Sequence, residues 1–211
     1  MTHSLHRYGT DESLKGDYTF IVRACQVNRE GCAPKLQKLL KLFLSEEPVN
    51  IGCNSVGKGT IVNGLDISEL AKAFDRTFRF ACVFSSREKV QRVLKKLKEA
   101  DAGISITIGG LINEIVEMAR AAGIKPHTAN ISLGLFGAKN SQLPDDKILS
   151  TTTMCGHGLI ATRLTKKVFK KIEAGELTPR EGALALAKHC PCAIFNMDRF
   201  EAILDSKEEK P

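Results

Sequence analysis

Short apolar runs alternate along the chain with longer segments in which apolar residues recur every three or four positions. The short runs predict strands, and the longer amphipathic segments predict helices. The predicted strands are Tyr18–Val22, Val49–Ile51, Thr60–Val62, Phe78–Phe84, Ile104–Ile108, Ala129–Leu135 and Ile148–Met154. The predicted helices begin at or just after Pro34, Asp66, Ser86, Gly110, Gly158 and Thr178.

Strands that alternate with helices of about ten to fifteen residues are typical of an α/β protein. We therefore expect one α/β domain over residues 17–204, with a mixed, largely parallel sheet flanked by helices. Residues 155–204 form its cysteine-bearing part, a helical C-terminal extension. Residues 1–16 are expected to form a polar N-terminal arm and residues 205–211 a disordered tail.

The composition is that of a globular protein, with 43% hydrophobic and 26% charged residues. No apolar run approaches the ~20 residues that a membrane-spanning helix needs, and the polar N-terminus lacks the apolar segment of a secretory signal. These features predict a cytoplasmic protein without a membrane contact. The net charge of +7 favours anionic partners, so we expect a small anionic substrate. Nucleic acid is disfavoured, because two Tyr and no Trp offer few stacking platforms.

Cysteines carry the main functional signal, because seven in 211 residues is a high number for a reducing compartment. The motifs Cys155-Gly156-His157 and Cys190-Pro191-Cys192 supply thiolate and imidazole, the donors that zinc or an iron–sulfur cluster takes. We expect Cys155, Cys190 and Cys192 to converge and to bind an iron–sulfur cluster or zinc, with His157 as a fourth ligand. Such a centre predicts redox, sulfur-transfer or group-transfer chemistry.

The same residues also support a thiol-dependent enzyme. Cys155 is expected where a strand gives way to a helix, and a helix N-terminus lowers the pKa of a thiol and aims backbone N–H groups at an oxyanion. His157 and His127 are then the candidate bases. A purely structural alternative is that these cysteines are buried packing residues.

Two glycine-rich loops are candidate anion sites. The loop Gly52–Thr60 has the spacing of a phosphate-binding loop in which Lys58 reaches the phosphate, although a β-rich segment follows it. A nucleotide-binding enzyme is therefore a further alternative. Gly109 and Gly110 precede a predicted helix, whose N-terminus favours negative charge. In a parallel sheet the carboxyl ends of the strands meet at one edge, so we expect these glycines to share a crevice with Cys155.

Two predicted helices carry basic faces. Most such faces are solvated, since long cationic side chains cover apolar surface while their charges stay in water. The other interpretation is docking of an acidic redox protein, and a non-catalytic interaction module is the last alternative. The basic residues are Lys89, Arg92, Lys95, Lys96 and Lys98 on one helix, and Arg163, Lys166, Lys167, Lys170 and Lys171 on the other.

Overall fold

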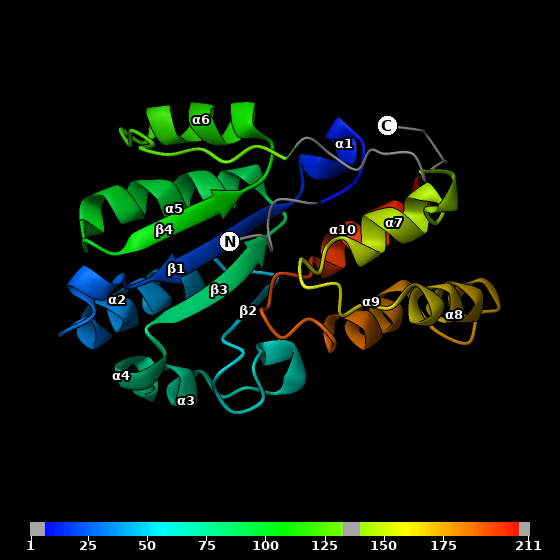
Figure 1. The fold of residues 1–211 in the computed structure, drawn as a ribbon, viewed down its shortest axis with the longest axis horizontal. Helices are drawn as coiled ribbons and strands as arrows, with labels where there is room; N and C mark the ends of the chain where they lie inside the picture. The colour runs from blue at the N-terminus through cyan, green and yellow to red at the C-terminus, as the bar shows by residue number, and fades with distance from the viewer. Residues whose placement is uncertain (1–6, 133–139, 207–211) are drawn as a thin grey trace.

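The computed structural model describes residues 7–132 and 140–206 (Figure 1). The strands are β1 (Tyr18–Arg23), β2 (Asn50–Gly52), β3 (Arg79–Phe84) and β4 (Ser105–Gly109). The helices are α1 (Asp11–Leu14), α2 (Ala33–Leu44), α3 (Ile67–Lys72), α4 (Phe74–Thr77), α5 (Arg87–Ala100), α6 (Ile112–Ala121), α7 (Asp146–Thr152), α8 (Thr162–Glu173), α9 (Pro179–Ala187) and α10 (Met197–Asp205). None of the helices in these ranges combines the length and the apolar character that crossing a membrane requires.

The strands form one sheet in the order β2-β3-β1-β4, and every pairing in it is antiparallel. The expectation of a largely parallel sheet was wrong, although the chain does mix strands and helices. Helix α2 lies between β1 and β2 in the chain, and α5 lies between β3 and β4, so each helix joins two strands that point the same way. These strands are not neighbours, because β3 lies between β1 and β2, and β1 lies between β3 and β4. This is a split βαβ arrangement, and its pattern along the sequence resembles that of a parallel sheet.

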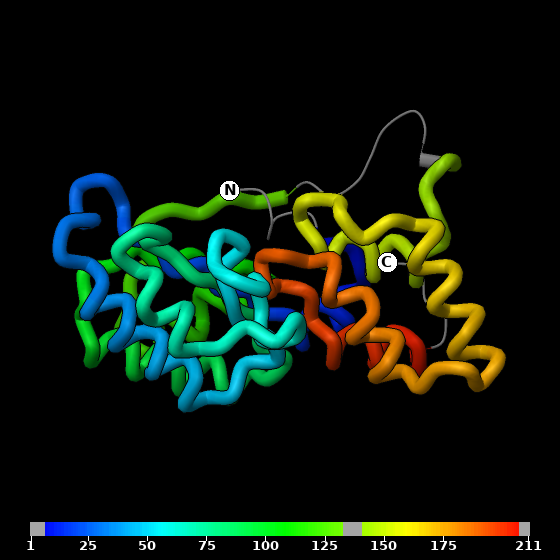
Figure 2. Tube along the Cα trace, turned by 90° about the horizontal axis from the view of Figure 1, so that it is seen from below, coloured from blue at the N-terminus to red at the C-terminus, as the bar shows by residue number. Residues whose placement is uncertain are grey.

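Both faces of the sheet are buried along β1 and β3, and alternate residues of each strand face opposite ways. Phe20 of β1 faces α2, where its ring packs edge-on against Phe43 at 5.1 Å between centroids. Ile21 of β1 and Ala81 of β3 face the other way and belong to a second core built with the C-terminal helices. Figures 1 and 2 show these helices as a group beside the sheet. The C-terminal extension is therefore packed against the sheet.

The start of the described chain is docked on the C-terminal helices. The backbone N–H of Tyr8 donates to Thr153 Oγ1 at 3.0 Å, and the Tyr8 hydroxyl donates to Asp146 Oδ1 at 2.8 Å. Arg199 of α10 donates to the Tyr8 carbonyl at 2.6 Å. The part of the expected polar arm that the structure describes is thus held in place by hydrogen bonds.

Some predicted elements differ from the structure. The Thr-rich run Ile148–Met154, predicted as a strand, lies largely in α7, because Asp145 caps the helix at Ile148 N and the Thr151 hydroxyl donates to the carbonyl four residues back. The Asp145 cap and the burial of Ile148, Leu149 and Thr151 outweigh the strand propensity of threonine, whose hydroxyls find partners in the preceding turn without stabilising the helix. Residues Thr60–Val62 lead into a 3-10 turn, Ile61–Asn63. Residues 129–132 have no strand, and the rest of that predicted strand lies outside the described residues.

The loop after β2 closes tightly on itself, which generates a first prediction. A β-carbon on Gly52 would lie 2.1 Å from the Gly59 carbonyl oxygen and 2.7 Å from Thr60 Cα, so the backbone would have to move. We expect Gly52→Ala to lower the free energy of unfolding by about 2–3 kcal/mol, as overpacking does. Urea denaturation measures the loss. Gly16→Ala is the control, because its β-carbon would meet only Ser85 O, at 3.6 Å; equal stability of the two variants would contradict the prediction.

Candidate thiol site

Cysteine-bearing segments meet where the sheet adjoins the C-terminal helices. Cys155 lies in the turn after α7, and Cys190-Pro191-Cys192 lies between α9 and α10. The loop after β2 reaches the second segment: Asn63 Nδ2 donates to Lys188 O at 3.4 Å, and a β-carbon on Gly59 would lie 3.8 Å from Pro191 O. Figure 2 shows this loop (cyan) beside the segment between α9 and α10 (orange). The structure therefore brings Cys155, Cys190 and Cys192 together in one core.

Cys155 is placed to be a thiolate. Its sulfur accepts a hydrogen bond from the Cys190 thiol, the largest influence on its pKa, and two more from the backbone N–H groups of His157 and Leu159. These donors outweigh burial and lower the pKa of Cys155 to about 5. The predicted cause was different, since α8 begins only at Thr162 and Cys155 follows the C-terminal end of α7. Turn amides and a second thiol, not a helix N-terminus, supply the stabilisation.

The other two sulfurs stay protonated. The pKa of Cys190 is raised well above the ordinary value, first because its proton is donated to Cys155 and second because it is fully buried. Burial raises the pKa of Cys192 to about 11. The Cys192 sulfur lies 3.5 Å from Nδ1 of His157, whose ring is exposed at the surface. The site therefore consists of two pairs: Cys155 with Cys190, and His157 with Cys192.

The turn that holds Cys190 and Cys192 has strained backbone. Ala193 adopts a φ of +56° and is fully buried. A residue with a β-carbon is uncommon in this left-handed region, which costs about 1–2 kcal/mol. Such strain persists only where surrounding contacts fix the backbone, and it occurs preferentially at functional sites.

Sequence reasoning missed two members of the site. Cys53, in the loop after β2, is 3% exposed, and its sulfur lies close enough to help raise the pKa of Cys192. Arg7 is buried as well, and burial lowers the pKa of its guanidinium, whereas Asp17, Cys190 and Cys155 favour its charged form. Cys53 could have been suspected from the cysteine count alone. No sequence signal singled out Arg7 among 31 basic residues.

The described residues contain no group of three or more His, Cys, Asp or Glu side chains arranged to hold a metal ion. A single tetrahedral zinc ion needs four donors around one point, whereas the donors here lie in two pairs. The thiolates of an iron–sulfur cluster bind different irons and so do not converge on one point. The expected zinc or iron–sulfur centre at Cys155, His157, Cys190 and Cys192 stays a prediction.

The remaining predicted site residues lie elsewhere. His127 is exposed in the stretch after α6, and no contact within the described chain joins it to a cysteine. Lys58 is exposed and runs along Gly64, and a 3-10 turn follows its loop where a phosphate-binding loop would have a helix. Gly109 ends β4, and a β-carbon on Gly110 would meet Ile115, Tyr18 and Asp17 rather than any cysteine. The crevice expected with Cys155 assumed parallel strands, and the sheet is antiparallel.

The basic helix faces differ in their partners. On α5, Lys89 pairs with Glu47, and Arg92 and Lys96 both pair with Glu46. On α8, Lys171 pairs with Glu176, whereas the other four cations form no ion pair within the described residues. The face of α5 is largely explained by these contacts, and an acidic partner for α8 stays a prediction.

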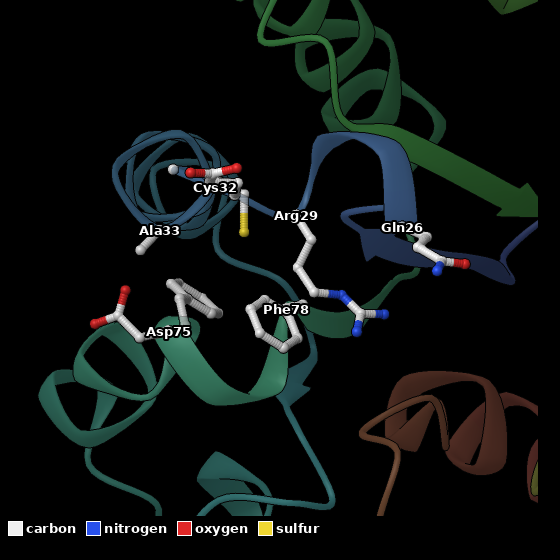
Figure 3. Close-up of a pocket in the computed structure, with 9 residues that line it drawn as sticks. Gln26, Arg29, Cys32, Ala33, Asp75 and Phe78 are labelled. Carbon is white, nitrogen blue, oxygen red and sulfur yellow. The ribbon is translucent and has the colours of Figure 1, made fainter.

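A cavity of about 460 Å³ lies at the other end of the molecule, between the start of α2 and the end of α4 (Figure 3). The Arg29 guanidinium lies 4.5 Å from the centroid of the Phe78 ring, and both side chains line the cavity with Asp75 and Cys32. None of the site residues predicted from the sequence lines this cavity. It is therefore separate from the thiol site.

The lowered pKa of Cys155 makes the folded state less stable in acid. A group whose pKa is lower in the folded protein contributes its full stabilisation of the folded state at pH values above its pKa in the unfolded chain. That pKa is about 8.5 for cysteine. This stabilisation is lost as the pH falls toward the folded value of about 5. Chemical denaturation should therefore show the stability difference between wild type and Cys155→Ser shrinking from pH 8.5 to pH 5, by at most about 1.4 kcal/mol per pH unit. The buried Cys82→Ala is the control, and a difference that does not depend on pH would refute the assignment.

Comparison with known proteins found no protein-family model, no curated protein and no solved structure that matches this chain. The arrangement of the side chains is therefore the basis on which a function is proposed.

Proposed function

We propose that this protein carries a redox-active dithiol, in which Cys155 is the reactive thiolate and Cys190 is the thiol that closes a disulfide with it. The observation that carries the proposal is that Cys155 and Cys190, from segments 35 residues apart in the chain, lie in one buried core, where each is the largest influence on the pKa of the other. A low pKa and a neighbouring thiol are two features of redox-sensing cysteines; the third is exposure to solvent, and Cys155 is only 2% exposed.

Burial defines the reagents that reach this pair. Cys155 is 2% exposed and Cys190 is fully buried, so a folded protein substrate has no direct access to either sulfur. A hydroperoxide is small enough to reach such a site through minor movements of the exposed turn at His157. We therefore take a small hydroperoxide as the oxidant class.

The chemistry balances over two steps. The Cys155 thiolate attacks the hydroperoxide ROOH, the O–O bond breaks, and Cys155 becomes a sulfenic acid while RO⁻ leaves and takes a proton from water. Cys190 then attacks the Cys155 sulfur, the S–S bond forms, the S–O bond breaks, and the hydroxide leaves as water with the Cys190 proton. The two sulfurs lose two electrons, and the peroxide gains them.

The first step also prepares the second. The Cys155 thiolate is the main reason that the pKa of Cys190 is raised. When Cys155 becomes an uncharged sulfenic acid, that influence disappears and Cys190 ionises more readily. The order of events therefore follows from the electrostatics of the pair, with Cys155 reacting first.

The metal-centre interpretation is the second candidate, and the observation that favours it is the number of soft donors. Cys53 adds a fourth buried sulfur to Cys155, Cys190 and Cys192, and a Cys₄ set is the usual complement of an iron–sulfur cluster. Bound metal would remove the free thiolate on which the dithiol chemistry depends, so the two functions give different results in one experiment.

The experiment combines thiol labelling with metal analysis of protein purified anaerobically. We expect iodoacetamide at pH 6 to label Cys155 at least about tenfold faster than any of the other six cysteines. One equivalent of hydrogen peroxide should then join Cys155 to Cys190, seen by mass spectrometry as a loss of two hydrogens and one linked peptide pair.

Variants assign the two roles. Cys190→Ser should leave Cys155 as a trappable sulfenic acid and prevent the disulfide, whereas Cys25→Ser, which removes an exposed thiol, should change neither result. Uniform slow labelling would contradict the dithiol. Stoichiometric iron with sulfide, or stoichiometric zinc, in protein that resists labelling would establish the metal centre instead.

A further inference from the structure

The cavity between the start of α2 and the end of α4 has the size and the lining of a small-molecule site (Figure 3). Its volume of about 460 Å³ lies within the range of ligand pockets, about 300–1,000 Å³. Its apolar lining comes from Phe74 and Cys32, which are buried, and from the half-buried ring of Phe78. The polar lining is exposed to solvent and consists of Gln26, Arg29, Glu30 and Asp75. Apolar walls with a few polar groups are typical of sites for small ligands.

The charged side chains of this lining are free to bind a ligand. Within residues 7–132 and 140–206, the side chains of Arg29, Glu30 and Asp75 form no ion pair and no hydrogen bond. Figure 3 shows the Asp75 carboxylate and the Arg29 guanidinium on opposite sides of the Phe78 ring. A positive and a negative group therefore flank the apolar part of the cavity.

The Phe78 ring holds Arg29 in place, and the backbone at Phe78 is strained. The Arg29 guanidinium lies 4.5 Å from the centroid of this ring, where the π system attracts a cation. Phe78 ends α4 with a φ of +53°, a position that glycine usually takes, and its carbonyl accepts from the Ala24 N–H at 2.9 Å. A bulky residue is rare in this left-handed region, and such strain occurs preferentially at functional sites. A ligand that packs on the ring explains why phenylalanine occupies this position.

We propose that this cavity binds a free α-amino acid with an aromatic side chain, whose carboxylate pairs with Arg29 and whose ammonium pairs with Asp75. The aromatic side chain packs against the two phenylalanine rings and the Cys32 sulfur, which are favourable neighbours for a ring. A ligand that is only anionic fits less well, because Glu30 makes the carboxylates of the lining outnumber its one guanidinium. The proposal does not rest on the dithiol, since none of these residues belongs to the thiol site.

The test is isothermal titration calorimetry of the full chain with three related ligands. L-phenylalanine carries both charges, L-phenylalaninamide lacks the carboxylate, and 3-phenylpropionate lacks the ammonium. We expect L-phenylalanine to bind at least about tenfold more tightly than either of the other two, because each hydrogen-bonded charge contributes about this factor. Binding of either analogue as tight as that of L-phenylalanine would contradict the proposal.

Variants assign each charge of the ligand to its partner. Arg29→Gln should weaken binding of L-phenylalanine about tenfold and leave that of L-phenylalaninamide unchanged, whereas Asp75→Asn should weaken both and leave 3-phenylpropionate unchanged. Structural damage would weaken all three ligands alike. Arg76→Gln is the control, because Arg76 is an exposed cation of α4 that does not line the cavity. Phe78→Gly should weaken all three ligands, and it spares the turn because glycine adopts a left-handed backbone without strain.

The position of the bound ligand is measured separately, by NMR of the wild-type amides. L-phenylalanine should shift the signals of Gly31, Ala33 and Phe78, which line the cavity, and leave those of His157 and Leu159 at the thiol site unchanged. Shifts confined to the thiol site, no saturation below about 10 mM, or equal losses for all three ligands in Arg29→Gln would overturn the proposal. These outcomes leave the dithiol unaffected, because alkylation of its thiolate is measured without any amino acid.

Discussion

The Asp17 carboxylate joins parts of the chain that are otherwise far apart. It lies directly before β1, and one of its oxygens contacts the guanidinium groups of Arg7 and Arg199 while the other accepts from Asn196 Nδ2 at 3.1 Å. These contacts are buried, and in the interior ionic hydrogen bonds are strong. They leave the side chains that make them no freedom to rearrange. The arm, the sheet and α10 are thereby fixed relative to one another, and the thiol site lies among them.

The split arrangement of the sheet explains why the cysteines meet where they do. Because β2 is a short edge strand, the loop after it is free to fold toward the C-terminal segment instead of continuing into the sheet. The face of the sheet opposite α2 and α5 receives the C-terminal helices, through residues such as Ile21 and Ala81. Cys53 therefore reaches the site from the sheet side, and Cys155 and Cys190 reach it from the helical side.

Local sequence signals predicted most elements, because their causes are local. Ser86 caps α5, and Thr178 forms a complete capping box with Glu181 at the start of α9. Strand order could not be predicted in this way. A helix that connects two neighbouring strands and a helix that connects two strands separated by a third leave the same alternation of strand and helix patterns in the sequence. The strand predicted for the Thr-rich run at α7 was wrong, because capping by Asp145 and tertiary packing of the buried residues outweighed strand propensity. The meeting of Cys155 with Cys190 followed from their motifs, whereas the roles of Cys53 and Arg7 depend on tertiary contacts.

The left-handed backbone at Ala193 has a consequence for how the two neighbouring sulfurs differ. The tight turn directs Cys190 toward Cys155 and Cys192 toward His157, although only Pro191 separates them in the chain. Neither thiol can take the other's place without unwinding a turn that the interior holds rigid. The two neighbouring thiols therefore differ: the Cys190 thiol shares its proton with Cys155 in the interior, whereas the Cys192 thiol keeps its proton next to the exposed ring of His157.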